Sequence, residues 1–303
     1  MSDAAPKTRA FRIGTMIKGN GPDPVGYVRQ ILPHGFESLQ PFFWQTLGGV
    51  DLARLADGLE DAIGDRDVTI PTLAMFGNPL EDQDLDRQTL DGWKALIDNA
   101  HLFGATTICG FTGRVRGKPL DESLPRYKEV WGDLAKRAAD RGLRIAFENC
   151  AMDGNWASGD WNIAHNPDAW QLMFDALPDE NIGLEWEPCH QLVYLIDPVP
   201  QIREWAHKIF HVHGKDATVR WDVIRRHGAF GKVPFVFMRT PGFGDTNWTD
   251  VISELRLGGY QGSIDIEGWH DPVYRDDLEM TGQVAALEHL KRSRGGSIIA
   301  NPT

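Results

Sequence analysis

The sequence predicts a single-domain α/β protein, a (β/α)8 barrel covering residues 1–303. Short apolar, β-rich runs alternate with helical patterns along the chain. Eight such units follow one another without a linker or low-complexity segment, and 303 residues fit that architecture. A doubly wound sheet is the alternative because it also alternates strands and helices. However, no GxGxxG follows the first run, and eight units are more than such sheets usually need.

The expected strands are apolar, and several are rich in β-branched residues. They span residues 11–17, 36–42, 69–76, 106–111, 144–150, 182–188, 209–214 and 262–268.

Helical spacing of apolar residues and helix-end signals mark the segments between these strands. Gly104 and Gly142 are typical residues just beyond a helix end. Asn166-Pro167 and Asp197-Pro198 each pair an N-cap residue with proline in the first turn. We expect helices over 51–63, 88–103 and 123–141, from 166, from 197, over 251–257 and over about 277–292. Residues 218–246 form a long irregular loop by this interpretation, and such loops often face the substrate.

Composition narrows the possible partners. The 43 acidic residues exceed the 31 basic ones, for a net charge of −12, which argues against binding to nucleic acid or anionic membranes. Cys109, Cys150 and Cys189 show no disulfide or CxxC pattern, and the last two are expected to be wall residues. Neither a signal peptide nor a membrane-spanning run is visible, so a cytoplasmic location is expected.

Four consecutive strands each end in a carboxylate or an imidazole. In such a barrel these ends surround the active site. Residues two apart in a strand share a face, so Glu185 and Glu187 point the same way, as do His211 and His213, and Asp265 and Glu267. The second residue of each pair lies nearer the mouth of the barrel. The resulting set is Glu148, Glu187, His213 and Glu267.

Three carboxylates around one imidazole would repel one another unless a cation neutralised them. This donor set suits Mn²⁺, our first choice, or Mg²⁺, Co²⁺ or Fe²⁺. His211 lies one layer deeper in the barrel and is interpreted as a core residue or as one that supports the ligands from behind. Glu185 is ambiguous, and Asp265 is a hydrogen-bonding or ion-pairing residue of the barrel.

Several motifs resemble the xylose-isomerase-like TIM barrels, in the sugar phosphate isomerase/epimerase branch. They appear in order as IAFENC (145–150), NIAHNPDAW (162–170), GLEWEPCH (183–190), DPV (197–199), IFHVHGKD (209–216), RTPGFGDTNW (239–248) and GYQGSIDIEGW (259–269).

The resemblance implies metal ligation by Glu148, His213 and Glu267. Glu187 stands where the family usually has Asp, one methylene shorter. His190 matches a histidine that contacts substrate in related epimerases. Lys215-Asp216 matches a pair common in the branch, but Ala217 and Thr218 follow instead of the arginine of ketose 3-epimerases, which makes that activity less expected.

The implied chemistry is proton abstraction next to a carbonyl, through an enediolate, with Glu148 and Glu267 as acid and base on opposite faces of a sugar or polyol. The alternative is a lyase or dehydratase, in which the same intermediate expels a β-leaving group from an oxidised (3-keto) sugar or glycoside. An apurinic endonuclease shares the barrel, but the acidic charge argues against it. A metal-free binding barrel is the remaining class.

Other mouth residues are candidates for substrate binding. Lys215 and Asn149 could hydrogen-bond hydroxyl groups, and Arg239 could reach the mouth from the long loop. Trp156 and Trp269, with Trp44 and Trp161, could stack on a sugar ring. The helical Trp93, Trp131, Trp170 and Trp205 are expected in the core. No phosphate-binding loop is evident. A homo-oligomer or a small partner subunit is compatible with the sequence.

Overall fold

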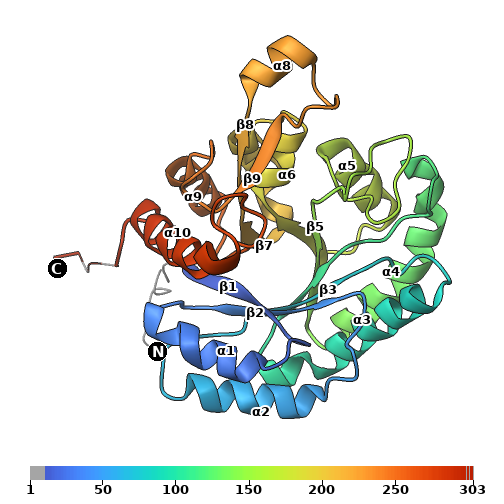
Figure 1. Cartoon of the computed structure of the whole chain (residues 1–303). Helices are drawn as coiled ribbons and strands as arrows, with labels where there is room; N and C mark the ends of the chain where they lie inside the picture. The colour runs from blue at the N-terminus through green and yellow to red at the C-terminus, as the bar shows by residue number, and fades with distance from the viewer. Residues whose placement is uncertain (1–10, 298, 300, 303) are drawn as a thin grey trace.

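Eight parallel strands close into one barrel in the computed structural model, which describes residues 11–297, 299 and 301–302. The strands are β1 (Arg12–Lys18), β2 (Leu39–Trp44), β3 (Thr72–Phe76), β4 (Thr107–Gly110), β5 (Arg144–Glu148), β6 (Ile182–Trp186), β7 (Ile209–Gly214) and β10 (Ser263–Ile266). Their order around the barrel is β1-β10-β7-β6-β5-β4-β3-β2 (Figure 1). The expected (β/α)8 barrel is confirmed.

Helices surround the barrel and connect its strands. They are α1 (Pro24–Ile31), α2 (Leu52–Ile63), α3 (Asp84–Phe103), α4 (Leu124–Ala139), α5 (Pro167–Ala176), α6 (Pro188–Val193), α7 (Pro198–Trp205), α8 (Trp221–His227), α9 (Trp248–Leu257) and α10 (Glu279–Ser293). Of these, α1, α6 and α8 were not anticipated. The Asp23 side chain caps α1, 2.8 Å from the amide of Gly26, in the same Asx-Pro pattern that opens α5 and α7.

Helix ends follow the local signals in the sequence. Gly104 and Gly142 follow α3 and α4 with φ of 68° and 67°, a conformation that favours glycine. Helix α3 begins four residues before the expected Gln88 because the Asp86 carboxylate accepts a hydrogen bond from the amide of Gln83, 3.0 Å away.

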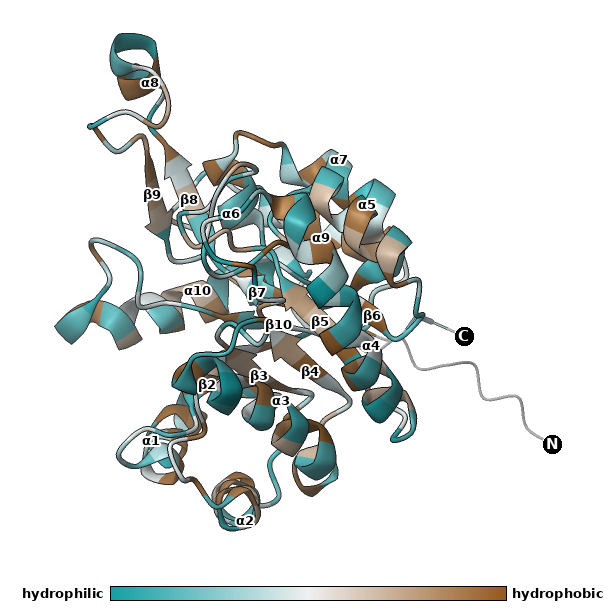
Figure 2. Ribbon diagram, turned by 90° about the vertical axis from the view of Figure 1, so that its right-hand side faces the viewer, coloured by the Kyte–Doolittle hydropathy of each residue, from teal (hydrophilic) through white to brown (hydrophobic). Residues whose placement is uncertain are grey.

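Hydrophobic residues concentrate on the strands and on the helix faces that pack against them, whereas the outer helix faces are largely hydrophilic (Figure 2). As expected, Trp93, Trp131, Trp170 and Trp205 are buried in this layer. Their burial removes these four tryptophans from the candidates for ligand binding.

The segment 218–246 is more regular than the expected loop. Strands β8 (Asp216–Val219) and β9 (Val236–Arg239) pair antiparallel, with α8 between them. This hairpin projects from the barrel in two views at right angles (Figures 1 and 2). At its base the Asp216 carboxylate accepts hydrogen bonds from the Thr246 amide at 3.0 Å and from Nε1 of Trp248 at 3.0 Å.

All three cysteines are buried and free. Within the described part of the chain, no helix combines the length and apolar character needed to cross a membrane.

Candidate active site at the mouth of the barrel

Four neighbouring barrel strands bring Glu148, Glu187, His213 and Glu267 together. One donor atom from each side chain lies within 4.8 Å of the others. Glu148 ends β5, Glu187 follows β6, His213 lies in β7, and Glu267 follows β10. All four are buried, the most exposed being Glu267 at 6%.

The strand register explains this convergence. Asp265 of β10 pairs with His213 of β7, so Glu267, two residues further on, emerges beside that imidazole. Glu187 is placed by Asn149, whose side-chain amide donates to the Glu187 carbonyl at 2.9 Å and accepts from the Glu187 amide at 2.7 Å. Asn149 therefore fixes the backbone on which the Glu187 carboxylate stands.

The carboxylates differ in their protonation. Burial, followed by the charge of Glu187, raises the pKa of Glu148 to about 7. Burial likewise raises the pKa of Glu187 to about 7. Burial also acts to raise the pKa of Glu267, but Lys215 and His270 outweigh it and hold that pKa well below its usual range. Glu267 is thus ionised at neutral pH, whereas Glu148 and Glu187 can each carry a proton.

Cationic and imidazole groups surround Glu267. Lys215 Nζ and His270 Nε2 lie 2.8 and 2.9 Å from its Oε1. Burial acts to lower the pKa of Lys215, but Glu187 and Glu267 outweigh it and raise that pKa well above its usual value. His190 lies 3.3 Å from Lys215, and burial together with the Lys215 charge lowers the pKa of His190 to about 3. Lys215 is therefore the proton-bearing partner and His190 is neutral.

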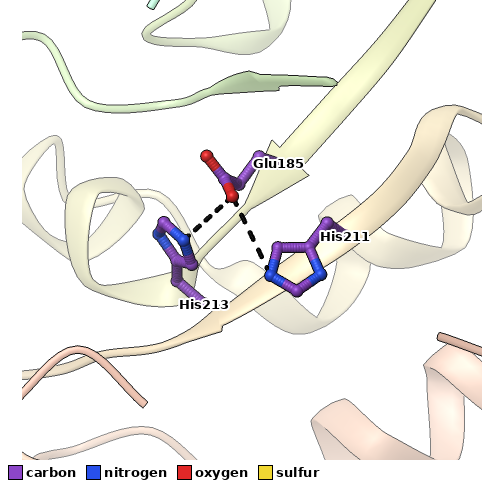
Figure 3. Close-up of side chains that lie close together, drawn as sticks. All are labelled: Glu185, His211 and His213. Atoms are coloured by element: carbon purple, nitrogen blue, oxygen red, sulfur yellow. Dashed lines mark ion pairs between the residues drawn. The ribbon is translucent and has the colours of Figure 1, made fainter. Parts of the chain in front are cut away.

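The imidazole of His213 has two different sides. Its Nδ1 faces the mouth, 3.2 Å from Oε1 of Glu148 and 3.6 Å from Oε2 of Glu267. Its Nε2 faces the barrel interior, 2.8 Å from Oε1 of Gln40 and 2.9 Å from Oε1 of Glu185. Figure 3 shows the Glu185 carboxylate directed at both His213 and His211. Burial acts to lower the pKa of His213, but Glu185 and Glu148 outweigh it and raise that pKa well above its usual value, so both ring nitrogens carry protons when no cation is bound. A cation that displaced the Nδ1 proton would leave the other proton on Nε2, held by Gln40 and Glu185.

A polar layer lies beneath. His211 Nε2 is 3.3 Å from the Asp265 carboxylate and 3.8 Å from that of Glu185. Asp265 also accepts hydrogen bonds from Ser38 and Ser263. His211 is buried, as expected for a core residue, and Asp265 is a hydrogen-bonded residue of the barrel interior.

Glu185, His211 and His213 also have donor atoms close enough to hold one ion. Both groups depend on His213, whose neutral ring offers a single lone pair. An ion bound at the mouth through Nδ1 therefore leaves Nε2 protonated, and the two groups exclude each other.

The upper group fits a divalent cation. Three carboxylates and one imidazole suit Mn²⁺, Mg²⁺, Co²⁺ or Fe²⁺ better than a thiophilic ion. Oε2 of Glu187 and Oε2 of Glu267 are buried without a hydrogen-bond partner among the described residues. Buried carboxylate oxygens without partners are costly, and coordination to a cation would satisfy them.

A cavity of about 770 Å³ opens above these groups and is lined by Glu148, His190, Lys215 and Glu267. Aromatic residues line another part of it, among them Phe42, Trp44, Phe76, Phe111 and Trp269. The cavity thus joins a charged floor to an aromatic side.

The residues expected to bind substrate divide into two groups. Lys215 and Trp269 line the cavity, whereas Asn149, Trp156 and Arg239 are not among the described residues that line it. Trp156 is 40% exposed. Arg239 Nε lies 3.0 Å from the Asp271 carboxylate, and its neighbour Met238 lines the cavity instead.

Sequence reasoning missed Gln40 and the phenylalanines of the cavity. Gln40 was visible as the one polar residue in an apolar strand, LQPFFW. Phe42, Phe76 and Phe111 gave no such signal, because aromatic residues near strand ends are usually core residues.

Residues 28–292 match the family model described as "Xylose isomerase-like TIM barrel". The chain is 23% identical over 268 residues to the uncharacterized protein YfiH of Bacillus subtilis (strain 168), covering 77% of this chain and 80% of that protein. It is 23% identical over 181 residues to inosose dehydratase of Clostridium tetani (strain Massachusetts / E88), covering 54% of this chain and 57% of that protein.

Solved structures share the fold. The structure of 3-keto-D-glucoside 4-epimerase, YcjR, from E. coli superimposes with a TM-score of 0.68 at 15% identity, covering 93% of this chain and 99% of that one. At this level of identity the likeness establishes the fold, and the chemistry has to be argued from the site.

Proposed function

Because the chain belongs to the xylose isomerase-like TIM barrel family, we propose that it is a divalent-metal-dependent isomerase or epimerase acting on a sugar or polyol. The observation that carries this proposal is the convergence of Glu148, Glu187, His213 and Glu267, with donor atoms within 4.8 Å of one another. An epimerase shares the fold, and the reaction class is argued from the site.

These four residues would hold the cation, through three carboxylates and Nδ1 of His213. Mn²⁺ is our first choice, and Mg²⁺, Co²⁺ and Fe²⁺ are the alternatives. When bound, the cation supplies positive charge that stabilises negative charge developing on a substrate oxygen.

Glu267 is the base in this proposal and Glu148 is the acid. Lys215 and His270 lower the pKa of Glu267 more than burial raises it, so Glu267 stays ionised. It can therefore take a proton from the carbon beside the carbonyl. Glu148 would return a proton to the other face of the substrate. Both carboxylates line the cavity, as a proton transfer from one face of the substrate to the other requires.

Lys215 orients the substrate. Its ammonium group lines the cavity and lies between Glu267 and His190, 2.8 and 3.3 Å away. It can donate to the carbonyl oxygen while it holds Glu267 ionised. His190, neutral and 2.8 Å from Glu187, can contact a neighbouring hydroxyl group.

The second candidate is a lyase or dehydratase that performs β-elimination on an oxidised (3-keto) sugar or glycoside. The Lys215 ammonium favours it, because a proton donor beside the base can protonate a departing oxygen. The similarity to inosose dehydratase supports it as well.

The test uses the full chain, stripped of metal with a chelator and reloaded with Mn²⁺. Ketoses, inososes and 3-keto-glucosides are incubated with it in D₂O and followed by NMR. Exchange of a carbon-bound proton without loss of a group supports the isomerase or epimerase, whereas release of water or an aglycone supports the lyase. If none of these substrates exchanges a carbon-bound proton or releases a group, the proposal is wrong.

Glu187→Gln should abolish tight Mn²⁺ binding, because it removes one charged ligand. Glu204→Gln is the matched control, since Glu204 is exposed on α7. Equal Mn²⁺ binding by the two variants would remove Glu187 from the proposed metal site.

A further inference from the structure

Five aromatic side chains form one face of the cavity, here called the aromatic wall: Phe42, Trp44, Phe76, Phe111 and Trp269. Phe42 and Trp44 come from β2 and Phe76 from β3, while Phe111 and Trp269 follow β4 and β10. The acidic residues come from the opposite half of the barrel, except that Glu267 and Trp269 share one loop. The wall is therefore a second, chemically distinct side of the site.

The aromatic wall is continuous. Phe42 stacks on Trp269 with ring centroids 5.2 Å apart and planes 19° apart. Phe76 packs on Phe111 at 5.1 Å, and Phe111 contacts Trp44 edge-on at 6.3 Å. The Phe76 ring lies 6.3 Å from that of His213, so the wall begins beside the ligand cluster.

The side chains of the wall differ in how far they reach the cavity. Phe76, Phe111 and Met16 are buried beneath it, Phe42 and Trp269 are half-buried, and Trp44 remains 40% exposed. The outer part of the wall, Phe42, Trp44 and Trp269, therefore presents apolar surface to the cavity, and Met152 and Met238 extend it. Exposed apolar surface of this kind usually marks a place where a ligand or partner is buried. Since it lies inside a cavity that also holds the acidic cluster, the ligand is the substrate.

The size of the cavity agrees with this reading. A volume of about 770 Å³ falls in the range that encloses drug-sized ligands. A single sugar ring placed at Glu148 and Glu267 would occupy the polar floor and leave the wall in contact with water.

We propose that the substrate carries an apolar, ring-sized group beside its reacting ring, as in a glycoside with an aromatic aglycone, and that this group lies against the aromatic wall. The identity of the reacting ring rests on the proposed function, whereas the placement of the second group rests on the wall itself. The wall is thus a specificity determinant, because it binds the part of the substrate that does not react.

A second sugar in place of the aglycone fits the wall less well. Phenylalanine and methionine side chains offer no hydrogen-bond donor or acceptor of comparable strength to the hydroxyl groups of a sugar. Such hydroxyl groups would lose water without replacement, which is costly. An aromatic aglycone has an apolar face that stacks on Phe42 or Trp44 without that loss.

The test compares paired probes by calorimetry on the Mn²⁺-loaded full chain. For each of several monosaccharides, the 4-nitrophenyl glycoside is compared with the methyl glycoside, and cellobiose and free 4-nitrophenol are added to the set. The 4-nitrophenyl glycoside should bind at least about tenfold more tightly than the methyl glycoside of the same sugar. Free 4-nitrophenol should compete with the 4-nitrophenyl glycoside. Equal binding within every pair, tighter binding of cellobiose, or no binding of any aryl probe overturns the proposal.

Trp44→Ala removes an exposed part of the wall, and Trp221→Ala removes a tryptophan of similar exposure on α8, 51% against 40%. The first should reduce the aryl preference, the ratio of aryl to methyl glycoside affinity, about tenfold, and the second should leave that ratio unchanged. Trp269→Ala is a second wall variant, with thermal unfolding to verify its fold. An unchanged aryl preference in both wall variants contradicts the proposal.

Failure of this inference is distinguishable from failure of the proposed function. If aryl probes bind but no carbon-bound proton exchanges and Mn²⁺ does not bind, the wall is a binding site and the proposed reaction is wrong. If methyl and aryl 3-keto-glucosides exchange protons equally well and bind equally, the reaction stands and this inference falls.

Discussion

Oε1 of Glu185 lies 2.9 Å from Nε2 of His213, on the side of the imidazole turned away from the barrel mouth. The same oxygen accepts a hydrogen bond from Nε2 of Gln40 at 2.6 Å, so the carboxylate is held in place from a second strand. When a cation binds Nδ1 of His213, the Glu185 carboxylate holds the remaining ring proton on Nε2. Glu185 therefore acts on the site through His213 without reaching the cavity.

Glu185→Gln should weaken Mn²⁺ binding about 10- to 100-fold, because a neutral amide holds the Nε2 proton less strongly and leaves the ring free to change tautomer. The measurement is Mn²⁺ affinity by electron paramagnetic resonance. The substitution keeps the side-chain volume, and an unaltered unfolding temperature of the metal-free variant would show that its fold is intact. Unchanged affinity would mean that Glu185 does not position His213.

Metal stoichiometry distinguishes the two possible clusters. We expect one Mn²⁺ per chain, since both clusters need His213 and the ring offers one lone pair. Equilibrium dialysis of the wild-type chain measures this number directly. Two tightly bound ions would show that Glu185 and His211 hold an ion of their own.

Asn149→Ala should destabilise the protein by about 1–3 kcal/mol, because it leaves the buried amide and carbonyl of Glu187 without partners. It should also weaken Mn²⁺ binding, since the Glu187 carboxylate loses its fixed backbone. Asn99→Ala, on α3, is the matched control. A variant that loses stability but binds Mn²⁺ as tightly as the wild type would limit Asn149 to a structural role.

Lys215→Met should move the acidic limb of the pH–kcat/KM profile upward. Lys215 is the principal charge that lowers the pKa of Glu267 against the effect of burial, so its removal lets that pKa rise. A fall in kcat with no shift of the limb would show that Lys215 contacts substrate without tuning the base.

Mn²⁺ affinity should rise as the pH increases through about 7. In the metal-free site burial raises the pKa of both Glu148 and Glu187 to about 7, so a cation must displace their protons below that pH. Proton release on binding, measured by calorimetry in buffers of different ionisation enthalpy, checks this. Affinity that is independent of pH between about 6 and 8 would contradict it.

The same shifts affect the metal-free fold. A carboxyl whose folded pKa lies above its unfolded value binds more protons when folded, so its contribution to stability falls as the pH rises from the unfolded pKa toward about 7. Buried His165 and His190, whose pKa values burial lowers to about 4 and about 3, act in the opposite direction, so the effect is measured against a variant that keeps them. Between pH 5 and pH 8 the unfolding temperature of the metal-free wild type should change less favourably than that of Glu187→Gln. Mn²⁺ should raise the unfolding temperature at pH 8 in the wild type and not in Glu187→Gln.

The sequence by itself determined the barrel and the composition of its mouth. Strand and helix periods depend on neighbouring residues, which is why all eight strands and the helix starts at Asn166-Pro167 and Asp197-Pro198 were visible. The same pattern at Asp23-Pro24 was missed. The alternation of side chains along a strand was enough to select Glu148, Glu187, His213 and Glu267, since residues two apart share a face. These are local relationships, and the chain order carries them.

Only the tertiary structure decided what lies around that cluster. Gln40 and Glu185 are 145 residues apart in the chain, yet they contact each other and His213 because β2 and β6 face across the barrel. The Asn149 side chain binds the Glu187 backbone and is not among the described residues that line the cavity. Phe42, Phe76 and Phe111, which the sequence pattern suggests are core residues, belong to the aromatic wall. Which way such side chains point depends on barrel closure and packing between distant strands, and these are set by contacts that no local pattern encodes.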